Sequence, residues 1–247
     1  MYGSEIWGWK ERKIVESVQL KYLKWILEVS KTTPNYIILE ETKTYKIRID
    51  TGYRAFHYEE KIVKNSEKQL LSACWKEMLW RQDRKKETKR DKERRSYLER
   101  NGYGVMGVRE CRNKNKNLEK QLIKRDQENQ EQEQRDKIEL SSFNEWYKFI
   151  ITNEVPKYLC KDWSGTSDQK TIARFRCGTV CIGSKLWKED DERQCRLCGA
   201  ARETVLHWIM ECRELSMENE EKGNILADSG EGFKWMKVIL CKLKKKS

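Results

Sequence analysis

Residues 194–212 read QCRLCGAARETVLHWIMEC, and this stretch decides how the C-terminal part of the chain can fold. Its polar ligands follow the pattern C-x2-C-x8-H-x4-C, formed by Cys195, Cys198, His207 and Cys212. Three thiolates and one imidazole are a donor set that tetrahedral Zn²⁺ prefers. The stretch therefore predicts one bound zinc ion.

The local sequence around these ligands predicts how they converge. Gly199 follows the second cysteine and lets the backbone reverse, and residues 203–210 show a helical pattern. Because His207 and Cys212 are five positions apart, Cys212 must lie at or beyond the end of that helix. The alternative is that the cysteines are small buried hydrophobes and the histidine a core residue. Four ligands at so compact a spacing favour a metal, and four protein ligands predict a structural site.

The composition of the 247-residue chain points to a polyanionic partner. Apolar residues make up 37% of the chain and charged residues another 37%, with a net charge of +12. We therefore expect compact helical pieces joined by solvated segments, and RNA or DNA as the natural ligand, because lysines and arginines release counterions from phosphates. Charge alone also fits ribosomal, chromatin or membrane-surface proteins. Most of the excess positive charge lies in residues 1–100.

The chain shows no transmembrane or secretory pattern. No run of 18 apolar residues occurs, and the N-terminus lacks a basic segment followed by an apolar one. Nine cysteines without a secretory signal are typical of a reducing compartment. We therefore expect an intracellular protein, nuclear or cytoplasmic, that is not secreted and does not bind a membrane.

Helical spacing of apolar residues predicts a mainly α fold. In residues 44–49 apolar and polar residues alternate, which could also indicate a short strand, although a helix is favoured. The expected divisions are a helical bundle over 1–100, a glycine break and polar linker over 101–142, and a C-terminal helical region over 143–247. The linker, rich in Gln, Glu, Lys and Asn, is expected to be either a polar helix or disordered.

Other candidate sites carry weaker predictions. Cys177 and Cys181, together with Cys160, could hold a second metal, but no histidine lies near them. The adjacent carboxylates Asp190 and Asp191 resemble a catalytic pair, but they lie in a polar stretch that favours a solvated loop. With no P-loop and no Ser/His/Asp set either, the residues predict that this chain alone is not an enzyme.

Four stretches together resemble one protein family. They are YGSEIWGWKERKIVESVQLKYLKWILEVSKTTPNYIILEE (2–41), NEWYKFIITNEVPKYL (144–159), KTIARFRCG (170–178) and CRLCGAARETVLHWIMEC (195–212). They are similar to the region after the palm in LINE-type (non-LTR) retrotransposon reverse transcriptases of the insect-like kind. The resemblance implies a helical thumb that grips a template–primer duplex, a linking region and a C-terminal CCHC zinc knuckle.

The resemblance also implies what this chain lacks. The family's endonuclease, fingers and palm, with the catalytic Tyr-x-Asp-Asp hairpin, have no counterpart in this sequence, and Met1 falls where the thumb begins. We therefore expect a C-terminal fragment that binds an RNA–DNA duplex or template RNA, with the missing palm as a further partner. Two alternatives remain open. One is a zinc-dependent protein–protein adaptor using Trp7, Trp9, Trp146 and Trp208; the other is an element remnant without a role.

Basic residues in three places are the expected phosphate contacts. The segment RQDRKKETKRDKERR (81–95) has lysines and arginines at four-residue spacing, which on one helix would form a basic stripe, although a merely solvated helix face fits equally. The candidates are Lys10, Arg12, Lys13, Lys21 and Lys24 near the N-terminus, Lys86, Arg90 and Arg94 on the stripe, and Arg174 and Arg176 before the knuckle.

Overall fold

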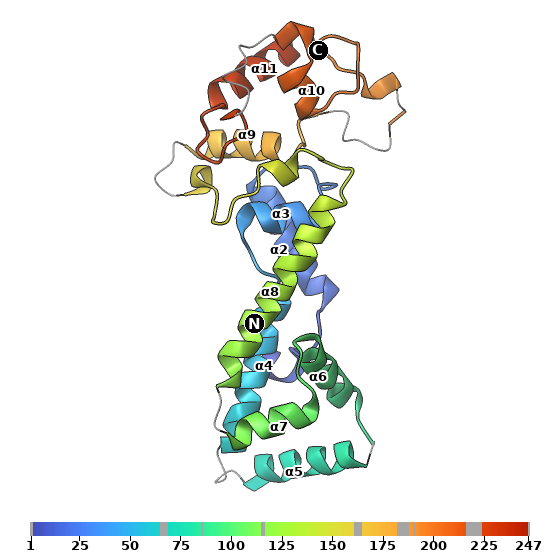
Figure 1. The fold of residues 1–247 in the computed structure, drawn as a ribbon, viewed down its shortest axis with the longest axis vertical. Coiled ribbons are helices and arrows are strands. Elements are labelled where there is room, and N and C mark those ends of the chain that lie inside the picture. Colours follow the sequence, from blue (N-terminus) through green and yellow to red (C-terminus); the bar gives the residue numbers. More distant parts are fainter. Residues whose placement is uncertain are drawn as a thin grey trace. The chain divides into compact units, whose positions relative to one another are not determined.

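The computed structural model describes residues 2–64, 69–84, 86–114, 117–160, 165–181, 188–189, 191–215 and 224–246. Throughout these ranges the regular structure is helical and no strand forms, which confirms the mainly α prediction (Figure 1). One isolated antiparallel bridge joins Gln194 and Arg202. None of the described helices combines the length and the apolar character that a membrane span requires.

The chain packs into two compact units, each built from two stretches of sequence. Unit 1 comprises residues 1–19 and 45–133, and unit 2 comprises residues 20–44 and 134–247. Helices α2 and α8 each contribute residues to both units. This grouping interleaves the sequence, whereas the predicted segments 1–100, 101–142 and 143–247 follow one another along it.

Unit 1 is a small helical assembly around one aromatic core. Its helices are α1 (Ser4–Trp7), the start of α2 (Lys13–Ile26), α4 (Ile47–Lys64), α5 (Gln69–Asp83), α6 (Lys89–Arg100), α7 (Val105–Asn113) and most of α8 (Leu118–Glu139). Helix α1 ends at Trp7, and a Cβ on Gly8 would lie 2.2 Å from the carbonyl oxygen of Thr51. The core residues are Trp9, Ala55, Phe56, Tyr97, Leu98, Val108, Leu118 and Leu122.

Helix α4 begins at Ile47, so the helical interpretation of this region is correct. The carboxylate of Glu16 accepts hydrogen bonds from the backbone N–H groups of Ile47, at 3.1 Å, and Arg48, at 2.7 Å. These N–H groups have no partner inside the helix, and a distant carboxylate satisfies them as a capping residue would. A contact from another helix thus sets the start of α4.

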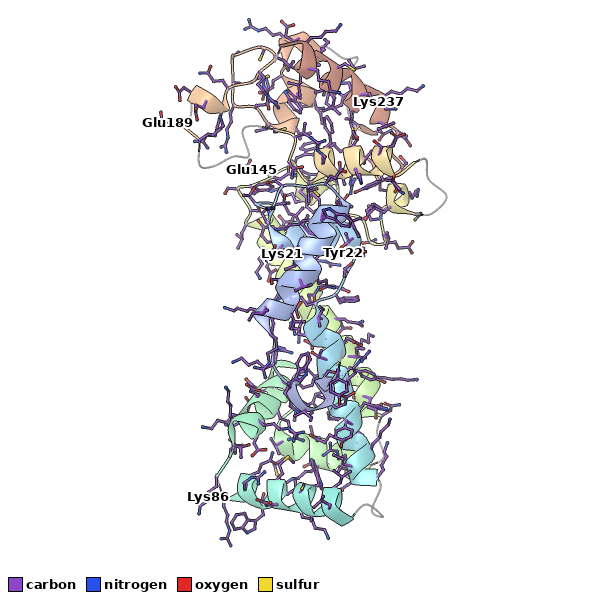
Figure 2. All side chains as sticks on the ribbon, turned by 180° about the vertical axis from the view of Figure 1, so that it is seen from behind. Lys21, Tyr22, Lys86, Glu145, Glu189 and Lys237 are labelled. Atoms are coloured by element: carbon purple, nitrogen blue, oxygen red, sulfur yellow. The ribbon has the colours of Figure 1, made fainter. Side chains whose placement is uncertain are left out.

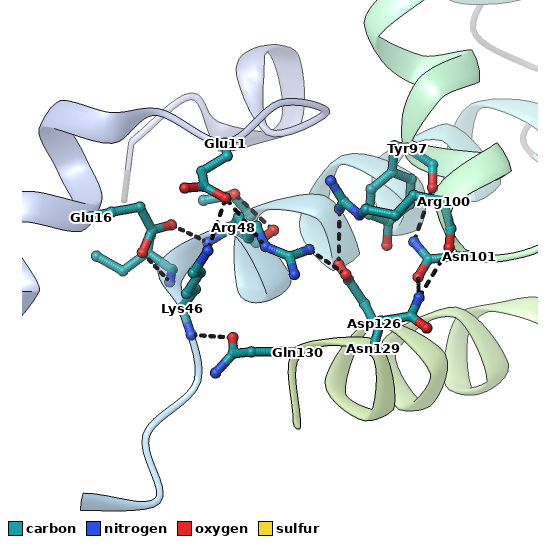
Figure 3. A network of polar contacts seen from close by, with 12 residues as sticks. Glu11, Glu16, Lys46, Arg48, Tyr97, Arg100, Asn101, Asp126, Asn129 and Gln130 are labelled. Atoms are coloured by element: carbon teal, nitrogen blue, oxygen red, sulfur yellow. Dashed lines mark hydrogen bonds and ion pairs between the residues drawn. The ribbon is translucent and has the colours of Figure 1, made fainter. Parts of the chain in front are cut away.

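A buried ion-pair network explains why the polar stretch Leu118–Glu139 forms helix α8 (Figure 3). Asp126 of α8 is fully buried and pairs with Arg48 of α4, which is also buried, and with Arg100 of α6 at 3.2 Å. Leu118 and Leu122 of the same helix enter the core. Of the two interpretations of the linker, the helical one therefore holds for Leu118–Glu139.

Unit 2 has the larger apolar core. Its elements are the end of α2, α3 (Asn35–Thr42), the end of α8, η1 (Tyr147–Phe149), η2 (Lys157–Leu159), α9 (Thr166–Arg176), η4 (Asp191–Arg193), α10 (Val205–Met210), η5 (Arg213–Leu215) and α11 (Phe233–Lys246). Phe175 of α9 contacts the ring of Trp208 on α10, at 6.0 Å between centroids, and that of Trp235 on α11, at 6.2 Å. These aromatic contacts join α9, α10 and α11 within the core of unit 2.

A fully buried carboxylate organises the middle of unit 2. Glu41 of α3 accepts hydrogen bonds from the hydroxyls of Tyr147, at 2.8 Å, and Tyr158, at 2.6 Å, and from Nε of Arg176, at 2.6 Å. Burial and the neighbouring Glu41 carboxylate raise the pKa of both tyrosines well above the usual value. The group ties residues 147–158 and α9 to α3, which positions the segments that precede the cysteine cluster.

Candidate metal centre

The four predicted ligands converge in unit 2. One ligand atom from each of Cys195, Cys198, His207 and Cys212 lies within 4.8 Å of every other, so the group could hold a metal ion. Sγ of Cys195 lies 3.9 Å from Sγ of Cys212, and Sγ of Cys198 lies 3.2 Å from Nε2 of His207. Three ligands are buried and Cys198 is half-buried. The sequence pattern alone identified this whole set.

A tight turn presents the first two cysteines. The N–H of Gly199 donates to the carbonyl of Cys195 at 2.7 Å, and the N–H of Cys195 donates to the carbonyl of Ala201 at the same distance. Gly199 has φ +68°, the left-handed conformation that glycine adopts without steric cost. The reversal expected after Cys198 is therefore present, and it brings both thiols to one side of the turn.

Helix α10 presents the other two ligands. Its N-cap Thr204 accepts a hydrogen bond from the backbone N–H of His207 at 2.9 Å, which fixes the first turn. The helix ends at Met210, and the N–H of Cys212 donates to the carbonyl of His207 at 2.8 Å. Cys212 thus lies beyond the helix end, as the five-residue spacing predicted, and the chain folds back to bring it beside the histidine.

Two carboxylates that sequence reasoning did not single out support the cluster. Nδ1 of His207 lies 3.2 Å from Glu211, so its N–H can donate to the carboxylate while Nε2 stays free for a metal. Glu203 is fully buried and accepts from the backbone N–H of Arg196 at 3.0 Å and from its guanidinium at 2.6 Å. This pair links the cysteine turn to the start of α10.

The environment of the thiols favours an uneven distribution of charge. Burial raises the pKa of Cys198, but a hydrogen bond from the backbone N–H of Ala200 and the contacts with the side chains of His207, Cys195 and Cys212 outweigh it and lower the pKa to about 7. Burial and the adjacent Cys195 raise the pKa of Cys212 to about 12. Cys198 is therefore the more easily ionised of the two thiols, and a cation at the cluster would favour ionisation of Cys212.

The second predicted cysteine group does not assemble among the described residues. Cys177 and Cys181 are buried in the apolar core of unit 2, and burial raises the pKa of both thiols well above normal. Cys160 is exposed at the end of η2. Of the carboxylate pair, Asp191 is exposed in η4, and Asp190 lies outside the described residues.

Two of the arginines predicted to contact phosphate are instead structural. Arg94 is buried, and its guanidinium donates to Glu59 at 2.6 Å. Arg176 is buried against Glu41. Each arginine is held by a buried carboxylate, since an unpaired charge would be costly in the core. These two predictions are wrong, and the residues organise the cores of their units.

The predicted basic stripe over residues 86–94 does not form. Thr88 caps α6 in a capping box with Asp91, so the helix begins at Lys89 and Lys86 precedes it. Lys86 and Arg90 are exposed, as is Lys21 on α2 (Figure 2). A capping box outweighs a continuous charge pattern because it satisfies the free N–H groups of the first turn.

The other candidate contacts differ in accessibility. Lys10 and Lys13 are exposed, and Arg174 is half-buried. Arg12 lies 3.4 Å from Glu93. Lys24 donates to the carbonyl of Lys31 at 3.0 Å, and burial lowers the pKa of Lys24.

Comparison with protein-family models, curated proteins and solved structures finds no match to this chain.

Proposed function

We propose that the chain is a zinc-stabilised, nucleic-acid-binding segment akin to the C-terminal part of a LINE-type reverse transcriptase. The observation that carries the proposal is the Cys3His group, whose four ligand atoms lie within 4.8 Å of one another. The net charge of +12 supports RNA or DNA as the ligand. The knuckle motif and the basic charge agree with the family that the sequence resembles.

Zinc fits the donor set better than other common divalent ions. Thiolates exclude the hard cations Mg²⁺ and Ca²⁺, which take oxygen ligands. A Zn–S bond of about 2.3 Å would place two thiolates of a tetrahedron about 3.8 Å apart, and the two buried sulfurs Cys195 and Cys212 lie 3.9 Å apart. Four protein ligands leave no open coordination position, so the ion would supply folding energy and no reaction chemistry.

The proposed binding mode is electrostatic. Exposed cations such as Lys10, Lys13, Lys21, Lys86 and Arg90 would displace counterions from phosphates, which gives affinity without base recognition. We therefore expect little sequence preference. We assign no catalytic step to the chain, because the polymerase activity of the family needs paired aspartates that a palm would supply.

Salt-dependent binding of a fluorescent RNA–DNA hybrid tests this function. The full chain loaded with zinc should bind the hybrid, and the logarithm of its association constant should fall linearly with the logarithm of the salt concentration. A scrambled hybrid of equal length should bind equally well. Failure of the zinc-loaded, folded chain to bind either hybrid at low salt would contradict the proposal.

Exposed aromatic surface favours a second candidate, the protein–protein adaptor. Of the four tryptophans expected on its surface, Trp9 and Trp208 are buried, and Trp7 and Trp146 are half-buried. In unit 2, however, Tyr22 and Trp25 are 58% and 70% exposed, and Trp25 borders a groove of about 330 Å³ shared with Leu159. Absence of nucleic-acid binding, with dye binding to apolar surface that Trp25→Ser reduces, would favour the adaptor.

A further inference from the structure

We propose that the exposed side of helix α11 is a phosphate-binding surface for nucleic acid, an inference that rests on the function proposed above. The surface is defined by Lys234, Lys237, Lys244 and Lys245 and is called the α11 lysine face. None of these residues was among the contacts expected from the sequence.

All charged residues of α11 are basic. The helix, FKWMKVILCKLKKK, carries six lysines and no acidic residue. In the rest of unit 2 acidic residues slightly outnumber basic ones. The excess positive charge of unit 2 is therefore carried by this helix. Its last turn is especially rich in lysine, where the negative end of the helix dipole favours cations.

The lysines of the face and the buried apolar residues lie on opposite sides of α11, and Val238, 50% exposed, lies beside the lysines. With each residue turning the helix by 100°, the four lysines of the face fall within an arc of roughly 100°. Figure 2 shows Lys237 on this helix. The opposite side is buried in the core of unit 2 and consists of Trp235, Met236, Ile239 and Leu243. The core thus holds the helix with its lysine face turned to solvent.

The ammonium groups of the face are largely available. Lys234, Lys244 and Lys245 are exposed and make no ion pair or side-chain hydrogen bond with the described residues. Lys237 lies 3.8 Å from Asp168 of α9 and over the ring of Phe233 at 4.2 Å. An exposed pair at that distance is weak, so a phosphate can compete with it.

The arrangement fits a nucleic acid better than a membrane. A basic helix that binds a bilayer inserts its apolar side, and here that side is already buried. From Lys234 to Lys245 the helix rises about 17 Å, a length over which one strand of B-DNA presents about five phosphates. The ring of Phe233 beside the face is half-buried and lies under Lys237, so the face would contact phosphates and not stack on bases.

A charge-neutralised variant of the full chain tests the inference. In the face variant Lys234, Lys237, Lys244 and Lys245 become Gln, and in the matched control the exposed lysines Lys61, Lys64, Lys76 and Lys120 of unit 1 become Gln. The face variant and the control variant each lose four positive charges. Loss of four phosphate contacts should reduce the salt slope of hybrid binding by about 3.6, at about 0.9 for each contact, and the control should change it far less.

The possible outcomes separate the two proposals. If wild type does not bind the hybrid, the proposed function fails. If wild type binds and the face variant has an unchanged slope, or the control loses as much, the α11 inference fails alone. A face variant that loses only its binding to phosphatidylserine vesicles would also overturn it. Zinc content and circular dichroism verify that each variant folds. If the quadruple variant misfolds, two double variants replace it, Lys234/Lys237→Gln and Lys244/Lys245→Gln. Each should lower the salt slope by about half of the change expected for the quadruple variant.

Discussion

At the scale of single residues, the sequence revealed the ligands of the metal centre but not the groups that hold them. Cys195, Cys198, His207 and Cys212 are close in sequence, so their spacing limits their positions in space. Glu211 was not singled out, because an acidic residue in a charged chain is normally a solvated one. Only the structure places its carboxylate 3.2 Å from Nδ1 of the histidine.

This carboxylate should tune the affinity for zinc. Replacing Glu211 with Gln removes the charged acceptor that orients the imidazole, and such changes weaken metal affinity by roughly 10- to 100-fold. Competition with a chromogenic chelator measures the affinity, with Glu145→Gln as the control because that exposed glutamate lies outside the cluster. An unchanged affinity in the Glu211 variant would show that the contact does not support the centre.

Buried arginines show the opposite error of sequence reasoning. Arg94 and Arg176 stand in basic contexts that predict phosphate contact, and both instead pair with buried glutamates far away in the sequence. No local pattern announces these partners, because Glu59 is 35 residues from Arg94 and Glu41 is 135 residues from Arg176. Arg174, which lies two residues before Arg176 and is half-buried, keeps its status as a candidate contact.

At the scale of elements, helix existence was predictable and helix limits were not. Apolar periodicity predicted a mainly α fold, since one face of each helix must be buried. The start of α4 depends on Glu16, and the start of α6 depends on the capping box of Thr88. The polar helix α8 is ordered through a buried aspartate, Asp126, whose partners lie on other helices. Contacts of this kind lie outside any local window of sequence.

An ion-pair cluster that joins three helices of unit 1 should make its stability sensitive to acid. Glu59 of α4 accepts from Arg94 of α6 and from Arg112 of α7. Burial alone would raise the pKa of Glu59, but attraction to the two guanidinium groups outweighs it, and the pKa is lowered. The folded state thus binds the carboxylate proton less tightly than the unfolded chain does.

The sign of the effect follows from this lowered pKa. The pairing stabilises the fold above the ordinary glutamate pKa of about 4.3, and the stabilisation is lost as the pH falls through and below that value. Denaturant unfolding should show that Glu59→Gln is less stable than wild type at pH 7. The difference should shrink in acid. A difference that stays constant across this range would show that the charge of Glu59 does not stabilise unit 1.

At the scale of the whole molecule, the two units reach stability by different means. Unit 1 joins its helices with a small aromatic core and buried ion pairs, among them Asp126 with Arg48. Unit 2 has a larger core, but its segment 195–212 contains one helix of only six residues. Structural zinc supplies on the order of 10 kcal/mol in small zinc-binding peptides, which is enough to order such a segment. We therefore expect metal removal to affect unit 2 first.

The zinc content of the purified full chain, compared with that of its His207→Ala variant, tests the central claim most directly. The cluster geometry predicts one zinc ion per wild-type chain and a loss of stoichiometric zinc in the variant. Removing the ion with a chelator should lower the thermal midpoint of wild type and leave that of the variant nearly unchanged. Wild-type chain without stoichiometric zinc, and with a melting curve identical to that of His207→Ala, would contradict the account.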